Sequence, residues 1–526
     1  MNKPNENARH GAMARVRAGI AGIAALACVV AAAILLALPG TALASDIEDR
    51  ITQVTSEEQA ELLSTASIGV QTGGLSTIYA ERDYPDADLQ EFSNVSDIAA
   101  ALEAGKIKYA FQPRCTALLY MRKNAKYTYL SPGVYSFDVH IGVTKGNDEL
   151  TEKINGALQK LKSDGTMDRL QQKWFFDGDY SMDDVPEAES GDVLRVAISA
   201  TAEPCMFIQD GEPAGLDIDI IKRVAYELGM RVEFQDTTFA GELTAVVSGK
   251  ADVALSYAWT EERAQQMNFT EVEYEQPWVA MCIDDGAEES GFLDTLEDNF
   301  TNSFLVENRW QLVLSGLGVT CLIAACSFVL ATLGGALLTW MGRRGGWTAT
   351  AAGGYAKLAT GIPTLVWLMI LYYIVFAGVD LSAIVVAIIC FGLVTSAPMA
   401  GVFRTGLDGV DSGQVEAASA MGFSEAQAFR HIVLPQAAGR VWALYAGEFT
   451  GLVKATSIVG YVAITDLTKA SDIIRSRTFQ AFFPLIATAL VYFAVIALAS
   501  WLFGLAARRL DPKHRSGKRI LKGIRQ

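Results

Sequence analysis

The chain has 526 residues, of which 51% are apolar, and it carries a formal net charge of -16 at pH 7. This length allows more than one domain, and the mean hydropathy of +0.24 fits a protein that is partly embedded in a membrane. The acidic excess argues against a chain that lies wholly in the membrane, because those charges need a soluble part. They lie mostly between Asp46 and Asp298.

The first segment, residues 1–44, has the features of a secretory signal peptide. Basic residues precede an apolar run from Ile20 to Leu38, and Ala42-Leu43-Ala44 supplies a cleavage motif before Ser45. We therefore predict a signal peptide over 1–44. An uncleaved membrane anchor is the alternative, and both place the following residues outside the cell.

The segment 45–185 is expected to alternate short strands with helices. The predicted strands are 68–70 and 139–144, and the predicted helices are 95–104, 149–163 and 170–175. Gly105 and Gly165 stand where helices end. Strands that alternate with helices in this way indicate parallel-sheet units.

A second α/β unit, 191–290, follows an acidic linker. Its predicted elements are a helix at 215–228 and strands at 194–197, 231–234 and 253–256. Asp217 and Asp219, at the start of the helix, could be a metal pair. Capping and interaction with the helix dipole is the preferred interpretation, because carboxylates are favoured at helix N-termini. We predict no metal site.

After a connector at 291–310, the segment 311–510 contains five apolar runs long enough to cross a membrane. They are Leu312–Met341, Leu358–Phe376, Leu381–Val402, Val441–Ile464 and Phe482–Ala506. The basic tail 511–526 and Arg343-Arg344 should be cytoplasmic by the positive-inside rule. A nucleic-acid partner for the tail is not expected, because a membrane helix immediately precedes it.

A polar stretch at 413–436 separates the third and fourth runs. Gly413 to Met421 reads as a short helix, and Gly422 stands where a left-handed residue would end it. Ser424 and Gln427 form a capping-box pattern for a second helix, which Pro435 is expected to stop near Leu434. Glycine and proline alone would fit an ordinary loop between membrane helices.

The full spacing of this stretch is more specific. Glu416-Ala417-Ala418, Gly422 and then Ile432-Val433-Leu434-Pro435 resemble the EAA loop of ABC importer permeases, of the polar amino-acid type. In that family the loop docks on an ATPase subunit. The resemblance therefore assigns ATPase docking to Glu416, Ala417, Gly422, Leu434 and Pro435. The chain contains no phosphate-binding Gly-x4-Gly-Lys-Ser/Thr loop, so ATP and Mg²⁺ are expected on that partner and no cofactor on this chain.

The two α/β segments resemble amino-acid-binding proteins of the periplasmic type. The stretches 69–73, 144–146, 161–166 and 173–175 are similar to the second lobe and the C-terminal helices of that family. The stretch 194–270 is similar to the first lobe, so the usual order is inverted. The expected fold is a two-lobed, circularly permuted α/β solute-binding domain, followed by an all-α five-helix membrane permease domain. Two degenerate half-copies are the alternative.

The resemblance also implies a ligand site. Arg263 matches the arginine that holds the α-carboxylate, Ser256 and the backbone of Ala258 are further donors, and Phe239 matches an aromatic that packs on the ligand. Thr260 and Gly73 complete this predicted set. A surface ion pair with Glu261 or Glu262 is the alternative role for Arg263.

Four positions depart from the family pattern. Ser199 replaces an acidic residue, Ala202 an aromatic, Leu75 a hydroxyl and Pro113 the aspartate for the α-amino group. Loss of that carboxylate leaves an ammonium group without its usual partner. We therefore expect either an unusual ligand or a domain that binds poorly.

The sequence thus predicts a subunit of an importer and not an enzyme. Its expected partners are an ABC ATPase, a second identical permease protomer, membrane lipid and a small solute of the polar amino-acid class. A ligand-gated channel or a receptor-like sensor is the alternative, but the chain lacks a pore-loop pattern and a signalling domain. Glu448 and Lys454 are candidates for the pathway or for helix contacts. A disulfide between Cys205 and Cys282 is conceivable outside the cell.

Overall fold

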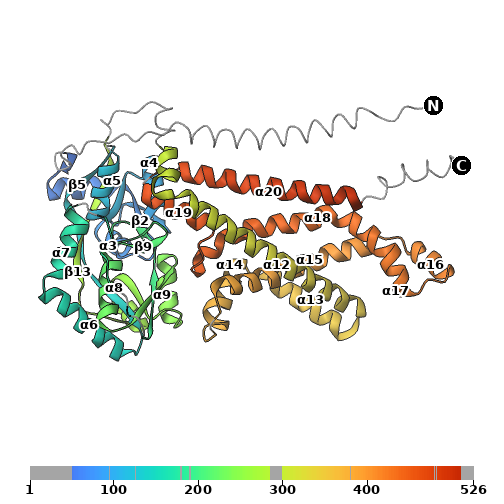
Figure 1. Cartoon of the computed structure of the whole chain (residues 1–526). Helices are drawn as coiled ribbons and strands as arrows, with labels where there is room; N and C mark the ends of the chain where they lie inside the picture. Colours follow the sequence, from blue (N-terminus) through green and yellow to red (C-terminus); the bar gives the residue numbers. More distant parts are fainter. Residues whose placement is uncertain are drawn as a thin grey trace.

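The structure is a computed structural model that describes residues 50–510, apart from 94, 125, 178–179, 187, 189–190, 285–298, 380, 479 and 481. The predicted signal peptide, the first part of the connector and the basic tail lie outside the described residues. Figure 1 shows an α/β part at one end of the molecule and a bundle of long helices that extends away from it.

A mixed ten-stranded sheet forms the α/β part, with the strand order β10-β6-β11-β5-β13-β4-β2-β3 and with β1 and β12 also paired to β5. Its strands are β1 (Thr52–Gln53), β2 (Ser67–Gln71), β3 (Asp88–Phe92), β4 (Tyr109–Pro113), β5 (Tyr127–Thr144), β6 (Val193–Ile198), β10 (Arg231–Asp236), β11 (Val253–Ala258), β12 (Met267–Phe269) and β13 (Tyr274–Ile283). A smaller sheet contains β7 (Thr201–Ala202), β8 (Met206–Gln209) and β9 (Glu212–Ala214).

Two long antiparallel strands divide this part into halves. β2 pairs in parallel with β3 and β4, and β6 pairs in parallel with β10 and β11, while β5 and β13 run antiparallel between the two groups. We call residues 50–130 the first half and residues 139–270 the second half. Each half has its own hydrophobic core, so the two can form the opposite walls of a cleft.

The helices of the α/β part cover the sheet. They are α2 (Ser56–Ser64), α3 (Leu75–Asp83), α4 (Val95–Glu103), α5 (Arg114–Lys123), α6 (Asp148–Ser163), α7 (Thr166–Gln171) with the wide turn η2 (Gln172–Asp177), α8 (Leu216–Glu227), α9 (Phe239–Val247) and α10 (Glu261–Gln266). The strands and helices predicted in this part are confirmed, most with small shifts of the ends, but the predicted strand 139–144 is only the last third of β5, which begins at Tyr127. The sheet is mixed where parallel units were predicted, because the first part of β5 and all of β13 were not predicted.

The helical part contains α12 (Trp310–Arg344), α13 (Gly346–Gly361), α14 (Thr364–Ile370) with η5 (Leu371–Val375), α15 (Ala383–Asp408), α16 (Ser412–Ala420), α17 (Glu425–Ala428) with η6 (Phe429–Val433), α18 (Leu434–Ala455), the 3-10 turn η7 (Thr456–Val462), α19 (Leu467–Thr478) and α20 (Phe483–Leu510). Among the described residues, α12, α15 and α20 are long and apolar enough to cross a membrane. A fourth crossing arises if α13 and α14 with η5 count as one span.

The predicted second run therefore differs from a straight helix. α13 and the segment Thr364–Val375 meet at 101°. Ile362 is extended there, with φ -114° and ψ 134°, because the ring of Pro363 disfavours a helical conformation in the residue before it. The fourth predicted run, 441–464, also differs, since α18 starts at Leu434 and ends at Ala455. Between α12 and α15, a side chain at Gly335 would come within 2.7 Å of Met399, so glycine permits this close packing.

Candidate functional site

A cavity lies between the two halves of the α/β part, and we call it the cleft. Residues of the first half on its wall include Gln71, Leu75, Pro113 and Thr116, and residues of the second half include Ser199, Thr201, Ala202, Phe239, Ser256, Ala258 and Arg263. The strands β5 and β13 contribute Phe137, Val139, Gln276 and Trp278. The lining combines aromatic surfaces with a few hydroxyl and amide groups, as in sites for small organic solutes.

Arg263 bridges the cleft. Its Nη1 donates to the carbonyl of Ala258 at 2.9 Å, and its Nη2 donates across the cleft to the carbonyl of Gly73 at 2.5 Å. Its guanidinium also lies 5.3 Å from the ring centroid of Tyr257. A guanidinium has five N–H donors, so these two bonds leave others for a carboxylate. Burial lowers the pKa of Arg263, partly offset by the nearby Tyr257 and Glu262. Among the described residues it forms no ion pair with Glu261 or Glu262.

The other predicted ligand residues lie around Arg263. Phe239, Ser256 and Ala258 line the cleft, and the Phe239 ring stacks on Tyr257 at 5.0 Å between centroids. Thr260 caps α10 by accepting from the backbone N–H of Arg263 at 3.1 Å, so it positions the arginine. Gly73 contributes its carbonyl. All six residues are therefore brought to one place.

All four residues that depart from the family pattern, Leu75, Pro113, Ser199 and Ala202, also line the cleft. Sequence reasoning missed Trp278, whose indole Nε1–H is buried and has no hydrogen-bond partner among the described residues. It also missed Thr116, which donates across the cleft to the carbonyl of Glu203 at 3.1 Å. The continuous apolar run 278–283 was the available signal for this strand.

Asp217 and Asp219 are both engaged by neighbouring protein groups. No group of three or more possible ligands that could hold a metal occurs in the part of the chain that the structure describes. Asp217 accepts from the Tyr274 hydroxyl at 2.6 Å, and Asp219 pairs with Arg223 at 3.0 Å. Both lie in the first turn of α8, as predicted, but their side chains serve tertiary contacts and do not cap the helix. Cys205 and Cys282 are free thiols.

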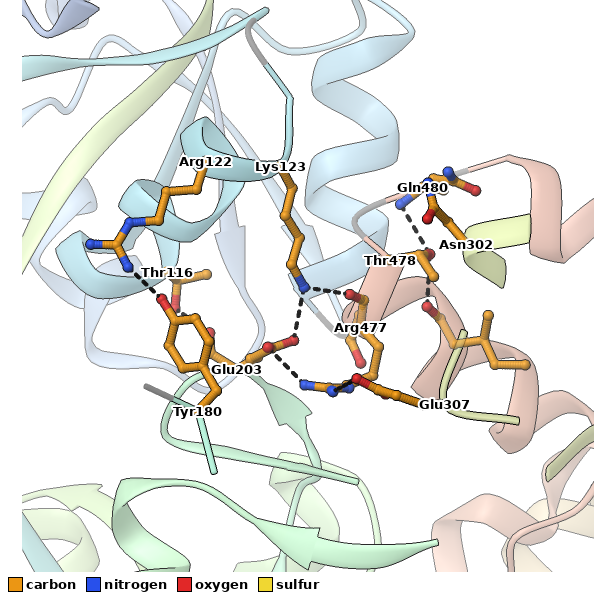
Figure 2. Close-up of polar contacts among 12 residues, drawn as sticks. Thr116, Arg122, Lys123, Tyr180, Glu203, Asn302, Glu307, Arg477, Thr478 and Gln480 are labelled. Atoms are coloured by element: carbon orange, nitrogen blue, oxygen red, sulfur yellow. Dashed lines mark hydrogen bonds and ion pairs between the residues drawn. The ribbon is translucent and has the colours of Figure 1, made fainter. Parts of the chain in front are cut away.

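A cluster of buried charges joins the α/β part to α19. Glu203, from the second half, forms ion pairs with Arg477 of α19 at 2.7 Å and with Lys123 of the first half at 3.4 Å, and Glu307 also pairs with Arg477 at 2.6 Å (Figure 2). The side chains of Arg477 and Glu203 are only 4% and 2% exposed. Removal of one partner of such a pair would leave a buried charge uncompensated, which is costly.

Two further cations of α19 reach the α/β part. Arg475 pairs with Asp97 of the first half at 2.8 Å, and Lys469 pairs with Asp236 of the second half at 3.1 Å. Lys469 also donates to the carbonyl of Thr237 at 2.8 Å. One short helix therefore binds both walls of the cleft.

The predicted helix-turn-helix lies at the end of the helical part that is far from the α/β part (Figure 1). Gly422 is left-handed with φ +87°, and Ser424 and Gln427 form the predicted capping box. Pro435 does not stop a helix, contrary to the prediction. It lies in the first turn of α18, where its missing N–H removes no intrahelical bond.

The predicted docking residues of this hairpin, Glu416, Ala417, Gly422, Leu434 and Pro435, are all exposed. Apolar side chains are exposed beside them, including Met421 at 68%. Phe423, Phe429 and Leu434 are exposed as well. The hairpin therefore exposes apolar side chains together with two acidic residues, Glu416 and Glu425, a composition that suits a protein partner.

Comparison with known proteins gives matches in both parts. Residues 316–512 match the family described as binding-protein-dependent transport system inner membrane component, and residues 39–177 match the bacterial extracellular solute-binding proteins, family 3. The probable amino-acid ABC transporter permease protein YckA of Bacillus subtilis is 31% identical over 211 residues, which are 38% of this chain and 89% of that protein.

Two other matches have similar coverage. The probable glutamine ABC transporter permease protein GlnM of Bacillus subtilis is 33% identical over 169 residues, which are 32% of this chain and 77% of that protein. A solved structure of an amino acid ABC transporter with histidines is 28% identical and covers 42% of this chain and 100% of its own, with a TM-score of 0.36.

Proposed function

Because this chain belongs to the amino-acid ABC transporter permeases and carries a solute-binding domain ahead of its permease domain, we propose that it captures a polar amino acid outside the cell and passes it through the membrane. A separate ATPase drives the step. The observation that carries this proposal is the cleft, where the predicted carboxylate-binding residues lie together and whose second half is bound to α19 through Glu203.

In the cleft, Arg263 is the group for the α-carboxylate. Its planar guanidinium suits two parallel hydrogen bonds to a carboxylate, and Ser256 can add a hydroxyl donor. The unpartnered indole N–H of Trp278 is a further donor on the same wall. Pro113 offers no carboxylate to an ammonium group, so the α-amino group must find backbone or amide acceptors, such as the side chain of Gln276.

The core of the second half supports a circular permutation over two degenerate half-copies. Trp174, near the end of the first predicted segment, packs in the same cluster as Leu194 and Val196 of the second segment. Two independent copies would each bury their own terminal helices. We therefore propose one two-lobed domain. The segments 45–185 and 191–290 are then consecutive pieces of a permuted chain, and neither segment is a lobe by itself.

We further propose five crossings of the membrane, with α18 and the bent α13–α14 pair added to α12, α15 and α20. Because five is an odd number, the solute-binding domain and the C-terminus then lie on opposite sides of the membrane, the domain outside and the C-terminus inside. The hairpin 413–436 then faces the cytoplasm, where its apolar face binds the ATPase with ATP and Mg²⁺. Glu448 and Lys454 lie on α18 and would face the pathway that two identical protomers enclose.

The test is solute binding by the full chain in detergent or nanodiscs, measured by calorimetry against all proteinogenic amino acids. Arg263→Ala should weaken binding roughly 10- to 100-fold, because hydrogen bonds to a charged group contribute about 1.5–3 kcal/mol. Arg231→Ala is the matched control, since Arg231 is exposed at the start of β10, away from the cleft.

A chain that binds no amino acid would contradict the substrate class. Equal affinity in Arg263→Ala and the parent chain would contradict the carboxylate role alone.

A further inference from the structure

A second cavity, which we call the junction chamber, lies between the solute-binding domain and the permease domain. It is formed by Ser93 of the first half, by residues of the second half, by the turn η7 and by α19, among them Ser457, Thr468, Lys469 and Asp472. Apart from one glycine, every residue on its wall carries a polar group. These groups can bind a solute, whereas a separate apolar cluster, with Ala245 and Tyr372 among its residues, holds the two domains together.

The chamber shares a wall with the cleft. Ser199 and Thr201 line both cavities, and their hydroxyl oxygens lie 3.4 Å apart. Both side chains are short and buried. The two cavities are therefore separated by small side chains and not by a layer of packed core, so a modest movement of the loop 199–201 would connect them.

We propose that the junction chamber is a handover site, which binds the solute after it leaves the cleft and before it enters the permease. This inference rests on the proposed function. The ligand class is a small zwitterion with one carboxylate and one ammonium group.

The charges around the chamber suit such a ligand. Lys469 uses two of its three N–H donors for Asp236 and the carbonyl of Thr237, which leaves one donor for a carboxylate. Asp472 lies on the same wall and pairs with Arg475 at 3.2 Å. A zwitterion can therefore meet a cation and an acidic group within one cavity.

Ion pairs flank the chamber and hold α19 against both halves of the domain. Lys469 binds Asp236, Arg475 binds Asp97, and Arg477 binds Glu203. While these pairs are intact, a solute that crosses the Ser199–Thr201 wall stays between the two domains. The way onward passes Ser457, which is exposed just after α18, the helix that carries Lys454.

Ser457 gives the sharpest test, because its hydroxyl bonds locally, to the carbonyl of Lys454 at 2.9 Å, and not to another element. It lines the chamber and does not line the cleft. In Ser457→Leu the larger side chain should fill the chamber, whereas Ser457→Ala leaves the space open. The full chain is reconstituted in nanodiscs with its ATPase, and both solute binding and solute-stimulated ATP hydrolysis are measured.

We expect Ser457→Leu to bind solute within about twofold of the parent affinity while solute-stimulated ATP hydrolysis falls at least roughly tenfold. Ser457→Ala should keep both. As a second measurement, the thiol of Ser457→Cys should react with a small methanethiosulfonate reagent more slowly when solute is present, with the parent chain as the baseline for its native cysteines.

The outcomes separate the two proposals. Normal binding together with normal stimulation in Ser457→Leu, or a Ser457→Cys thiol that solute does not protect, would overturn the handover site alone. Loss of solute binding in Ser457→Leu would overturn the separation of the chamber from the cleft. A parent chain that binds no amino acid would overturn the proposed function and the handover site with it.

Discussion

At the scale of single residues, three carboxyl groups beneath the cleft are fully or almost fully buried and form no ion pair with another described residue. They are Asp217, Glu242 and Glu273. Burial raises the pKa of Asp217 to about 6, against the opposing hydrogen bond from Tyr274. Burial raises the pKa of Glu242 and of Glu273 in the same direction. The folded domain therefore favours the protonated form of these acids.

This predicts a stability that falls as the pH rises. Below the unfolded pKa of about 4, Asp217 is protonated in both states and its contribution is complete. As the pH rises from about 4 to about 6, the carboxyl of the unfolded chain ionises while the buried carboxyl of the folded chain keeps its proton. The folded state therefore loses stability relative to the unfolded state, and the loss is complete above about pH 6. An asparagine side chain at this position would accept the same bond from Tyr274 without ionising. Asp217→Asn should match the parent near pH 4 and be about 1–3 kcal/mol more stable at pH 8.

The measurement is the unfolding of the domain within the full chain, followed by tryptophan fluorescence in denaturant at several pH values. Asp86→Asn is the control, because Asp86 is exposed in a loop. A difference between Asp217→Asn and the parent that is the same at all pH values would contradict the role of burial.

The limits of sequence reasoning are also visible at this scale. The six predicted ligand residues and the four residues that depart from the family pattern all lie at the cleft. They could be predicted because each was matched to a position that lines the ligand site in the family. Trp278 could not be chosen in this way, because its strand was not predicted. The left-handed conformation of Ser256, with φ +62°, was equally hidden, because it arises from a register shift between β11 and β5.

At the scale of elements, the sequence predicted correctly the features that depend only on neighbouring residues. The turn at Gly422 and the capping box at Ser424 depend on neighbours in the chain, and both are confirmed. The strand β13 and the first twelve residues of β5 depend on pairing over large sequence separations, and they were not predicted. Pro435 was misjudged because a proline ends one helix or begins another, and the sequence alone does not distinguish these cases.

The hairpin carries the second prediction. Gly422→Arg together with Glu416→Lys should abolish co-purification of the ATPase while solute binding stays unchanged. An L-residue at φ +87° costs about 1–2 kcal/mol, and the added positive charges change the exposed face. Gly165→Arg is the matched control, because Gly165 is also left-handed, at φ +79°, has no atoms within 4 Å of an added side chain, and lies in the solute-binding domain. ATPase capture equal to that of the control would contradict the docking role.

At the scale of the whole molecule, the placement of α19 could not be predicted. Its cations, Lys469, Arg475 and Arg477, resemble the basic residues that flank many membrane helices, and their partners in the solute-binding domain, Asp236, Asp97 and Glu203, lie more than 200 residues away in the chain. No local pattern links such residues. The structure makes α19 one contact between the two domains, and its ion pairs reach both halves of the solute-binding domain. Figure 2 shows Arg477 of this helix between Glu203 and Glu307.

The third prediction concerns this contact. In Arg477→Met, the long apolar stem of the side chain is largely kept, but Glu203 and Glu307 lose a buried cation. Removal of one partner of a buried pair costs about 3–5 kcal/mol, so the docked arrangement should weaken by that order. Arg82→Met removes the exposed pair with Asp83, and there we expect a loss of about 0–1 kcal/mol.

Limited proteolysis of the connector and of α19, with thermal unfolding in parallel, measures this difference. Arg477→Met should be cleaved faster between the domains, while the apolar cluster that joins the two domains, with Ala245 and Tyr372 among its residues, stays intact because it does not contain the substituted residue. The same variant should still bind solute, since Arg477 does not line the cleft. Solute binding that persists while stimulation of ATP hydrolysis is lost would mean that α19 transmits the state of the cleft to the permease. Cleavage at the rate of Arg82→Met would instead mean that the domains are held together by their apolar contacts, and that the buried charges serve only to align them.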